Sequence, residues 1–153
     1  MNINLLILII ILNVIPFLIG RKWNISELEW YKQNKLPQIL PGYYFGIIWT
    51  ILYTFMAISL YKILLLPTSN IKTVTIIFFV IQLLLNYSFT PIFVSKQLVL
   101  SNYIILLTLL FASITTVLLL QLDLVAGILF IPYLVWLIQA LYFNNRLAEL
   151  VFS

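Results

Sequence analysis

The chain contains no cysteine and no histidine among its 153 residues. Their absence excludes disulfide bonds, thiolate metal sites, cysteine nucleophiles, histidine general bases and histidine-ligated haem. Charge is also scarce, because Asp, Glu, Lys and Arg make up only 8% of the residues, against roughly a quarter in a soluble domain. The composition therefore excludes many of the common catalytic and metal-binding sites.

Apolar residues take the place of the missing charge. They make up 64% of the chain and raise the mean hydropathy to +1.16, so lipid rather than water is the expected solvent. A membrane-spanning helix needs about 20 apolar residues, and the sequence holds five such runs. They predict a single domain over residues 1–153, an all-α membrane protein built as a bundle of five transmembrane helices. The runs cover about residues 4–20, 42–66, 71–94, 98–120 and 124–147.

The loops predict how the bundle is oriented. The later connections are short, so consecutive helices are expected to be antiparallel, and the one long polar segment is loop 1, about residues 21–41. The net charge of +4 is small and lies at helix ends, which favours a topology signal over a nucleic-acid surface. By the positive-inside rule, loop 1 and the C-terminus are expected to be cytoplasmic and the N-terminus outside. That side carries Arg21, Lys22, Lys32, Lys35, Lys96 and Arg146, and the other side carries Lys62 and Lys72.

Several residues predict local features of the helices. Asn13 and Pro16 fall inside the first run, where neighbouring helices must satisfy the backbone groups that they free. In loop 1, Ser26 and Glu29 are spaced as the N-cap and N3 residues of a short helix. Asp123 is expected to cap the fifth helix at its N-terminus.

Small residues predict where helices approach closely. Gly42 and Gly46 match the small-xxx-small pattern, which allows a loop or a neighbouring helix to come near. The fourth run carries small and hydroxyl residues at near-heptad spacing, which favours a close seam between helices over a binding site. These residues are Ser101, Thr108, Ala112 and Thr115.

Aromatic and amide residues share faces on three of the runs. Because polar groups in lipid are costly unless paired, these faces are expected to point into the bundle. Two simpler explanations are an aromatic belt at the membrane surface and hydrogen bonds that only hold helices together. A third is a cavity for a flat hydrophobic ligand with one or two polar groups. The faces are Phe45, Trp49 and Tyr53; Gln82, Asn86, Phe89 and Phe93; and Tyr133, Trp136, Ala140 and Asn144.

Three blocks of motifs follow one another between Trp30 and Leu150. They are Trp30-Tyr31 with Pro37, Pro41, Phe45, Trp49-Thr50, Leu52-Tyr53 and Met56; Leu85-Asn86 with Phe89, Pro91, Ile92 and Phe93; and Pro132-Tyr133-Leu134-x-Trp136 with Ala140, Tyr142 and Asn144. In this order and spacing the chain resembles the TspO/MBR family, the translocator proteins also called peripheral benzodiazepine receptors.

The resemblance implies five tightly packed transmembrane helices and a ligand pocket near loop 1. Members of this family bind porphyrins and other tetrapyrroles, sterols, and isoquinoline or benzodiazepine-type ligands. No required cofactor is implied, and haem or another porphyrin is a candidate ligand. The family topology agrees with the charge count. Carried over by motif, the pocket residues are Trp49, Tyr53, Asn86, Phe89, Trp136, Ala140 and Asn144, with Trp30 and Pro41 in a loop that covers them.

The chain departs from the family pattern at a few positions. In the family's P-x-W-x-P-P stretch, Ile39 replaces the Trp and Gly42 replaces the second Pro, and Phe89 stands where the family usually has Trp. Leu36 stands before the first Pro of that stretch, where the family has Lys. These departures bear on the structure of the covering loop and on ligand preference.

Three functions are compatible with these observations. The leading hypothesis is a transporter or sensor that binds tetrapyrroles or sterols in the bilayer. The second is a light-driven porphyrin-degrading enzyme, in which the stacked indoles of Trp49 and Trp136 are the redox-capable groups. The third is a scaffold or oligomerisation module, with a homodimer as its candidate assembly. Neither a catalytic carboxylate pair nor a metal site is expected, because no two acids fall within one run.

Overall fold

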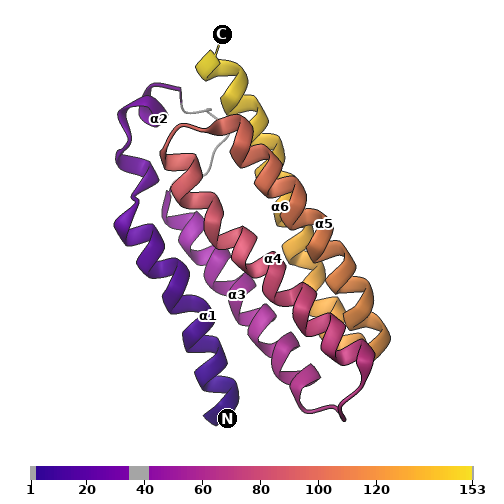
Figure 1. The fold of residues 1–153 in the computed structure, drawn as a ribbon. Coiled ribbons are helices and arrows are strands. Elements are labelled where there is room, and N and C mark those ends of the chain that lie inside the picture. The colour runs from indigo at the N-terminus through magenta and orange to yellow at the C-terminus, as the bar shows by residue number, and fades with distance from the viewer. Residues whose placement is uncertain (1–2, 35–41, 153) are drawn as a thin grey trace.

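A computed structural model describes residues 3–34 and 42–152 of the chain (Figure 1). All regular structure in these residues is helical, and five of the helices are long and apolar enough to cross a membrane. The prediction of an all-α bundle with five transmembrane helices is therefore confirmed. The five are α1 (Ile3–Lys22), α3 (Gly42–Leu64), α4 (Asn70–Val94), α5 (Leu98–Leu122) and α6 (Leu124–Phe152).

The predicted C-terminal ends of four helices differ from the observed ones, and α1 and α5 each continue two residues farther, to Lys22 and Leu122. α3 ends at Leu64 rather than 66, and α6 continues to Phe152 rather than 147. The 29 residues of α6 span about 44 Å, more than the roughly 30 Å of a hydrocarbon core. α6 is thus longer than the hydrocarbon core requires. Its last part carries an ion pair between Arg146 and Glu149.

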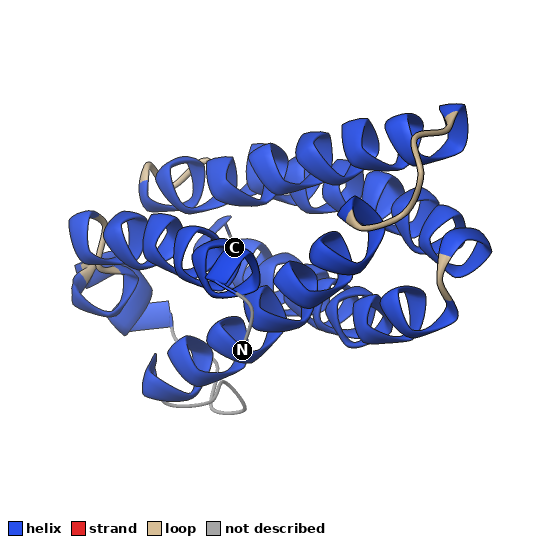
Figure 2. Cartoon of the chain, turned by 90° about the horizontal axis from the view of Figure 1, so that it is seen from below, coloured by secondary structure: helices blue, strands red, loops and turns tan. Residues whose placement is uncertain are grey.

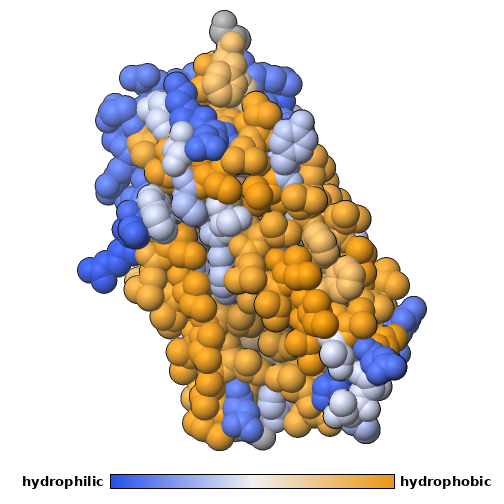
Figure 3. Space-filling model, in the orientation of Figure 1, coloured by the Kyte–Doolittle hydropathy of each residue, from blue (hydrophilic) through white to orange (hydrophobic). Residues whose placement is uncertain are grey.

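The helices pack side by side in a closed ring, in the order α1, α3, α6, α5, α4. Figures 1 and 2 show this bundle from the side and from below, with the two termini at opposite ends in Figure 1. α1 packs on α3 and more lightly on α4, and Leu12 is the only buried residue that it contributes. On the face drawn in Figure 3, hydrophilic residues gather mainly at the two ends, with an apolar belt between them.

The backbone carbonyl that Pro16 leaves free is satisfied by a neighbouring helix, as predicted, whereas the shorter hydrogen bond of Asn13 is within α1. Pro16 cannot donate a hydrogen bond to the carbonyl of Leu12, and the hydroxyl of Tyr87 on α4 donates to that carbonyl instead, at 3.2 Å. The side-chain amide of Asn13 donates to the backbone carbonyl of Ile9 at 2.9 Å and lies 3.5 Å from the Thr54 hydroxyl on α3. These contacts tie α1 to the bundle.

The small-residue stripe of α5 is buried, as the seam prediction requires. Thr108 and Thr115 donate to the carbonyls of Ile104 and Phe111 one turn earlier, at 2.7 and 2.8 Å. The Ser101 hydroxyl donates within α5 and also accepts a hydrogen bond from Asn144 on α6. The stripe can therefore face its neighbours without leaving an unpaired polar group. Ser101, Thr108, Ala112 and Thr115 are each at most 1% exposed.

The turn between α5 and α6 brings three helices together. Asp123 caps α6 as predicted, accepting a hydrogen bond from the backbone N–H of Ala126 at 2.8 Å. This bond holds the pKa of the Asp123 carboxyl below its usual value, and Lys62 at the end of α3 adds an ion pair of 3.0 Å that acts in the same direction. Just beyond, Gly127 lies directly against Leu120, so α5 and α6 are in close contact where a side chain is missing.

The other glycine pattern does not form a close contact. Gly46 on α3 is exposed, and a side-chain carbon placed on it would have nothing within 4 Å. The expectation that Gly42 and Gly46 allow a close approach is therefore wrong for Gly46. The missing side chain instead leaves open space on the α1 side of the cavity described below.

Loop 1 folds differently from the capping prediction. Ser26 lies inside a 3-10 turn, η1 (Ile25–Glu27), and α2 (Glu29–Asn34) begins at Glu29, so Glu29 is the first rather than the third residue of the short helix. Packing accounts for the shift, because the rings of Trp30 and Tyr31 lie 5.3 and 6.1 Å from that of Phe93 on α4. These contacts hold α2 over the end of the bundle.

Candidate functional site

A cavity of ≈760 Å³ lies inside the bundle at the end where loop 1 is found. Its volume falls in the range of cavities that enclose small organic molecules, about 300–1,000 Å³. Residues of α1, α3, α4 and α6 form most of its wall, α5 contributes two, and loop 1 and α2 contribute the rest.

Aromatic rings from α3 and α6 form one wall of the cavity. Trp49 stacks on Tyr53, one turn along α3, with ring centroids 5.3 Å apart and an angle of 25° between the planes. Trp136 on α6 stands perpendicular to Trp49 at 6.2 Å, and its other neighbour Phe45 lies 5.7 Å away. The expectation that Trp49 and Trp136 stack on each other is therefore wrong, since the two indoles meet edge to face. The wall offers ring surfaces in two orientations.

A hydrogen-bonded pair lies deeper in the cavity. The hydroxyl of Tyr53 donates to the side-chain carbonyl of Asn86 on α4, with 2.5 Å between the oxygens. The pair joins α3 to α4 across the bundle and fixes the direction of both side chains. The Asn86 amide therefore adds a polar group to an otherwise apolar surface.

A second amide, Asn144 on α6, is committed to the neighbouring helix. Its amide nitrogen lies 3.2, 2.8 and 2.6 Å from the Leu98 carbonyl, the Ser101 hydroxyl and the Asn102 side-chain oxygen. The carbonyl oxygen of Asn144 and the indole nitrogen of Trp136 have no hydrogen-bond partner among the described residues, although both atoms are buried. A buried polar atom without a partner is costly, so a ligand that paired with these atoms would gain affinity.

Charged residues are scarce on the cavity wall. The cavity wall, as far as the structure describes it, contains no Asp or Glu, and Arg21 is its only charged residue. No group of three or more potential metal ligands occurs in the described residues. What the wall supplies is stacking surface and a few hydrogen-bonding groups.

Comparison with known proteins gives the family. The model of the TspO/MBR family matches residues 5–149, nearly the whole chain. The chain belongs to the TspO/MBR family. Its relatives include the tryptophan-rich sensory protein of Cereibacter sphaeroides, 32% identical over 118 residues, covering 76% of this chain and 73% of the relative. Protein CrtK of Rhodobacter capsulatus is 31% identical over 115 residues, covering 72% and 71%. Protein TspO of Chlorobaculum tepidum is 31% identical over 112 residues, covering 72% and 71%.

Family membership and the five apolar helices together make this chain an integral, multi-pass membrane protein. The structure also places the residues that the TspO/MBR resemblance selected. All seven predicted pocket residues line the one cavity, although they come from three helices that are far apart in sequence. They are Trp49, Tyr53, Asn86, Phe89, Trp136, Ala140 and Asn144. Their contact with a ligand stays a prediction.

The two residues assigned to the covering loop, Trp30 and Pro41, are not found on the cavity wall as the structure describes it. Trp30 packs on Phe93 and is not among the residues that line the cavity, whereas its neighbour Tyr31 is. Burial raises the pKa of the Tyr31 phenol above 10, so its hydroxyl stays protonated at neutral pH and is available as a donor. Pro41 lies outside the described residues.

Sequence reasoning missed the contribution of α1 to the TspO/MBR cavity. Six residues of this helix line the cavity, and four of them, spaced three, one and three apart, share one face. That spacing marks one face of a helix and could have been recognised, but the other faces of α1 are equally apolar and gave no contrast. The four are Asn13, Pro16, Phe17 and Gly20.

Proposed function

We propose that this TspO/MBR protein binds a flat, hydrophobic small molecule in its cavity, a tetrapyrrole such as a porphyrin, and acts as a membrane sensor or transporter. A sterol is the second ligand class to test. The printed name of the Cereibacter sphaeroides relative, a tryptophan-rich sensory protein, supports the sensory role.

The observation that carries the proposal is the chemistry of the cavity wall. The rings of Phe45, Trp49 and Tyr53 form a stripe on α3, and Trp136 stands across from it. Stacking on such rings favours a planar ligand, because offset-stacked and edge-to-face contacts each add about 0.5–1.5 kcal/mol beyond the apolar area that is buried. The unpaired atoms of Trp136 and Asn144 would then pair with polar groups of the ligand.

The proposed orientation places the loop 1 end of the cavity on the cytoplasmic side. Arg21 and Lys22 at the end of α1 lie at this end of the bundle, as do Lys96 and Arg146, and basic residues favour the cytoplasmic side. A ligand in the cavity would then lie in the cytoplasmic half of the bilayer, under loop 1.

The binding site is tested by filling the cavity from α6. We predict that Ala140→Leu weakens protoporphyrin binding by about tenfold or more, because the added carbons occupy space that the ligand needs, and each tenfold loss corresponds to about 1.4 kcal/mol. The measurement is a titration of the purified protein with protoporphyrin, followed by quenching of tryptophan fluorescence. Asn144→Ala is less suitable, because it also breaks the contacts of α6 with α5.

Gln139→Leu is the matched control. It introduces the same side chain one position earlier on the same helix, where residue 139 is exposed on the outside of the bundle. This variant should bind protoporphyrin like the unmodified chain. Equal affinities for all three proteins would reject the cavity as the binding site.

The two other functions have their own tests. If the chain degrades porphyrin, illumination in air should bleach the bound porphyrin spectrum, and Trp49→Phe should stop the bleaching. If it is a scaffold without a small ligand, neither protoporphyrin, haem nor cholesterol should raise its melting temperature, because only a ligand that binds the folded state stabilises it.

A further inference from the structure

Arg21 is the only charged side chain among the described residues that line the cavity. It is the next-to-last residue of α1, so it lies where the helical wall gives way to loop 1. Farther down, Asn13 and Gly20 line the same cavity from the same helix. The charge of Arg21 is therefore placed at one end of the cavity rather than in its middle.

The two ends of the cavity differ in chemistry. An α-helix rises 1.5 Å per residue, so Arg21 lies about 12 Å along α1 from Asn13. Asn13 contacts Thr54, the neighbour of Tyr53 in α3, and so lies at about the level of the Tyr53–Asn86 pair. Aromatic and amide groups line both ends, since Trp23, Asn24 and Tyr31 lie near Arg21, but among the described residues only the loop 1 end has a guanidinium, about 12 Å from Asn13.

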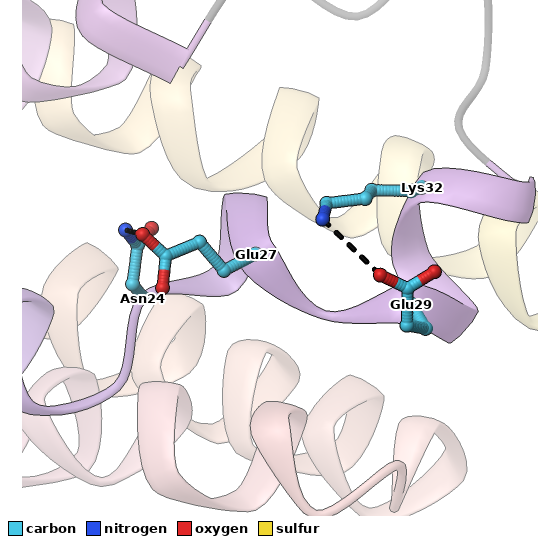
Figure 4. Close-up of polar contacts among 4 residues, drawn as sticks. All are labelled: Asn24, Glu27, Glu29 and Lys32. Carbon is cyan, nitrogen blue, oxygen red and sulfur yellow. Dashed lines mark hydrogen bonds and ion pairs between the residues drawn. The ribbon is translucent and has the colours of Figure 1, made fainter.

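The guanidinium of Arg21 has no hydrogen-bond or ion-pair partner among the described residues. The two acids nearest to it in sequence are engaged elsewhere in loop 1, as Figure 4 shows: Glu27 accepts a hydrogen bond from Asn24 at 2.8 Å, and Glu29 pairs with Lys32 at 3.3 Å. Arginine stays protonated in proteins, and its fork of N–H donors matches a carboxylate in a bidentate arrangement. A carboxylate is therefore the complementary group for this end of the cavity.

We propose that Arg21 binds a carboxylate at the edge of the ligand, so that the cavity selects an anionic ring compound over a neutral one of the same shape. The inference rests on the proposed function, because it requires the ring system of the ligand to lie against the aromatic wall. It names the ligand class as a planar ring system with an acidic side chain. A neutral sterol would leave Arg21 without a partner.

Lys22 provides a matched comparison for this role. It follows Arg21 in the same last turn of α1, where either charge would favour the helix dipole and the orientation in the membrane. Lys22 does not line the cavity, and its ammonium lies 4.4 Å from the ring centroid of Trp23. A general effect of charge at this end of α1 would appear in both residues, whereas recognition of a ligand carboxylate would appear only in Arg21.

The test compares two ligands with the same ring system, protoporphyrin IX, which carries two carboxylates, and its neutral dimethyl ester. Binding to the unmodified chain, Arg21→Gln, Arg21→Lys and Lys22→Gln is measured by fluorescence quenching in nonionic detergent without phospholipid. We expect Arg21→Gln to weaken binding of the acid about fivefold, near the upper limit for a solvent-accessible charge pair. Arg21→Lys should recover part of this loss. Lys22→Gln should bind the acid like the unmodified chain, and all four proteins should bind the ester alike.

The outcomes separate this inference from the proposed function. If both ligands bind but Arg21→Gln loses no more affinity for the acid than Lys22→Gln does, the role of Arg21 is overturned and the porphyrin cavity stands. An equal loss for acid and ester in Arg21→Gln would also overturn it, since that result indicates a change in cavity shape. If neither ligand binds the unmodified chain, the proposed function itself is wrong.

Discussion

The contact of Gly127 on α6 with Leu120 on α5 gives a prediction whose size follows from the structure. A β-carbon on Gly127 would lie 2.4 Å from the Cγ and Cδ2 of Leu120 and 2.8 Å from its backbone nitrogen. Carbon atoms in contact are normally about 3.5–4.0 Å apart, so each of these distances is a clash. The Leu120 side chain is 37% exposed and can turn toward lipid, but its backbone nitrogen is fixed within α5.

Gly127→Ala should therefore destabilise the fold. Forcing extra atoms into such a contact costs about 1–3 kcal/mol, and we expect the upper part of this range, about 2–3 kcal/mol, because backbone must move. Alanine recovers roughly 1 kcal/mol of helix propensity relative to glycine, which leaves a net loss of about 1–2 kcal/mol. The free energy of unfolding can be measured from the loss of helical circular dichroism as the protein is titrated with SDS in mixed micelles.

Gly46→Ala is the control for the propensity term. It makes the same substitution inside a transmembrane helix, but the new carbon meets no atom within 4 Å. Gly46→Ala should be as stable as the unmodified chain or up to about 1 kcal/mol more stable. The reasoning is refuted if Gly127→Ala is as stable as Gly46→Ala, because the contact with Leu120 would then impose no constraint.

Two further predictions concern the hydrogen bond from Tyr87 to α1 and the cap of α6. Tyr87→Phe removes the donor to the Leu12 carbonyl that Pro16 leaves free, so the free energy of unfolding should fall by about 1 kcal/mol in the same SDS titration. A loss smaller than about 0.3 kcal/mol would count against this hydrogen bond. The hydrogen bond from Ala126 lowers the pKa of Asp123, so its contribution is complete above the ordinary value of 3.8 and is lost as pH falls through the lower folded pKa. The melting temperature should therefore drop below about pH 4, and Asp123→Asn, which keeps a capping side chain, should reduce that drop.

The sequence predicted those features that depend on local chemistry or on lipid as the solvent. Long apolar runs predicted the five helices. Asp123 predicted the cap of α6 because its side chain and the N–H of Ala126 that it accepts from are only three residues apart. The stripe that includes Thr108 was predictable because small residues at regular spacing have no reason to face lipid. Most residues of the polar and aromatic faces line one cavity, for the related reason that an amide such as Asn86 is costly in lipid unless it points inward. Gln82 and Tyr133 of these faces are buried in the bundle but do not line the cavity.

What could not be predicted depends on contacts between distant segments. Ser26 and Glu29 have capping spacing, but the packing of Trp30 and Tyr31 on Phe93 decides where α2 begins. α1 is apolar on every side, so hydropathy could not tell which face lines the cavity. The end of α6 was placed too early because apolarity marks where lipid ends, whereas a helix continues as long as its backbone bonds and its neighbours support it.

α1, which forms part of the cavity wall, packs less tightly on the rest of the bundle than the other four transmembrane helices do. Leu12 is the only residue that α1 buries, and the helix packs on α3 and more lightly on α4. A ligand lying against Asn13, Pro16 and Gly20 would add a packing contact on the side of α1 that faces the cavity. If the proposed ligand binds there, its binding and the packing of α1 would be coupled, so the order of α1 would report whether the cavity is occupied.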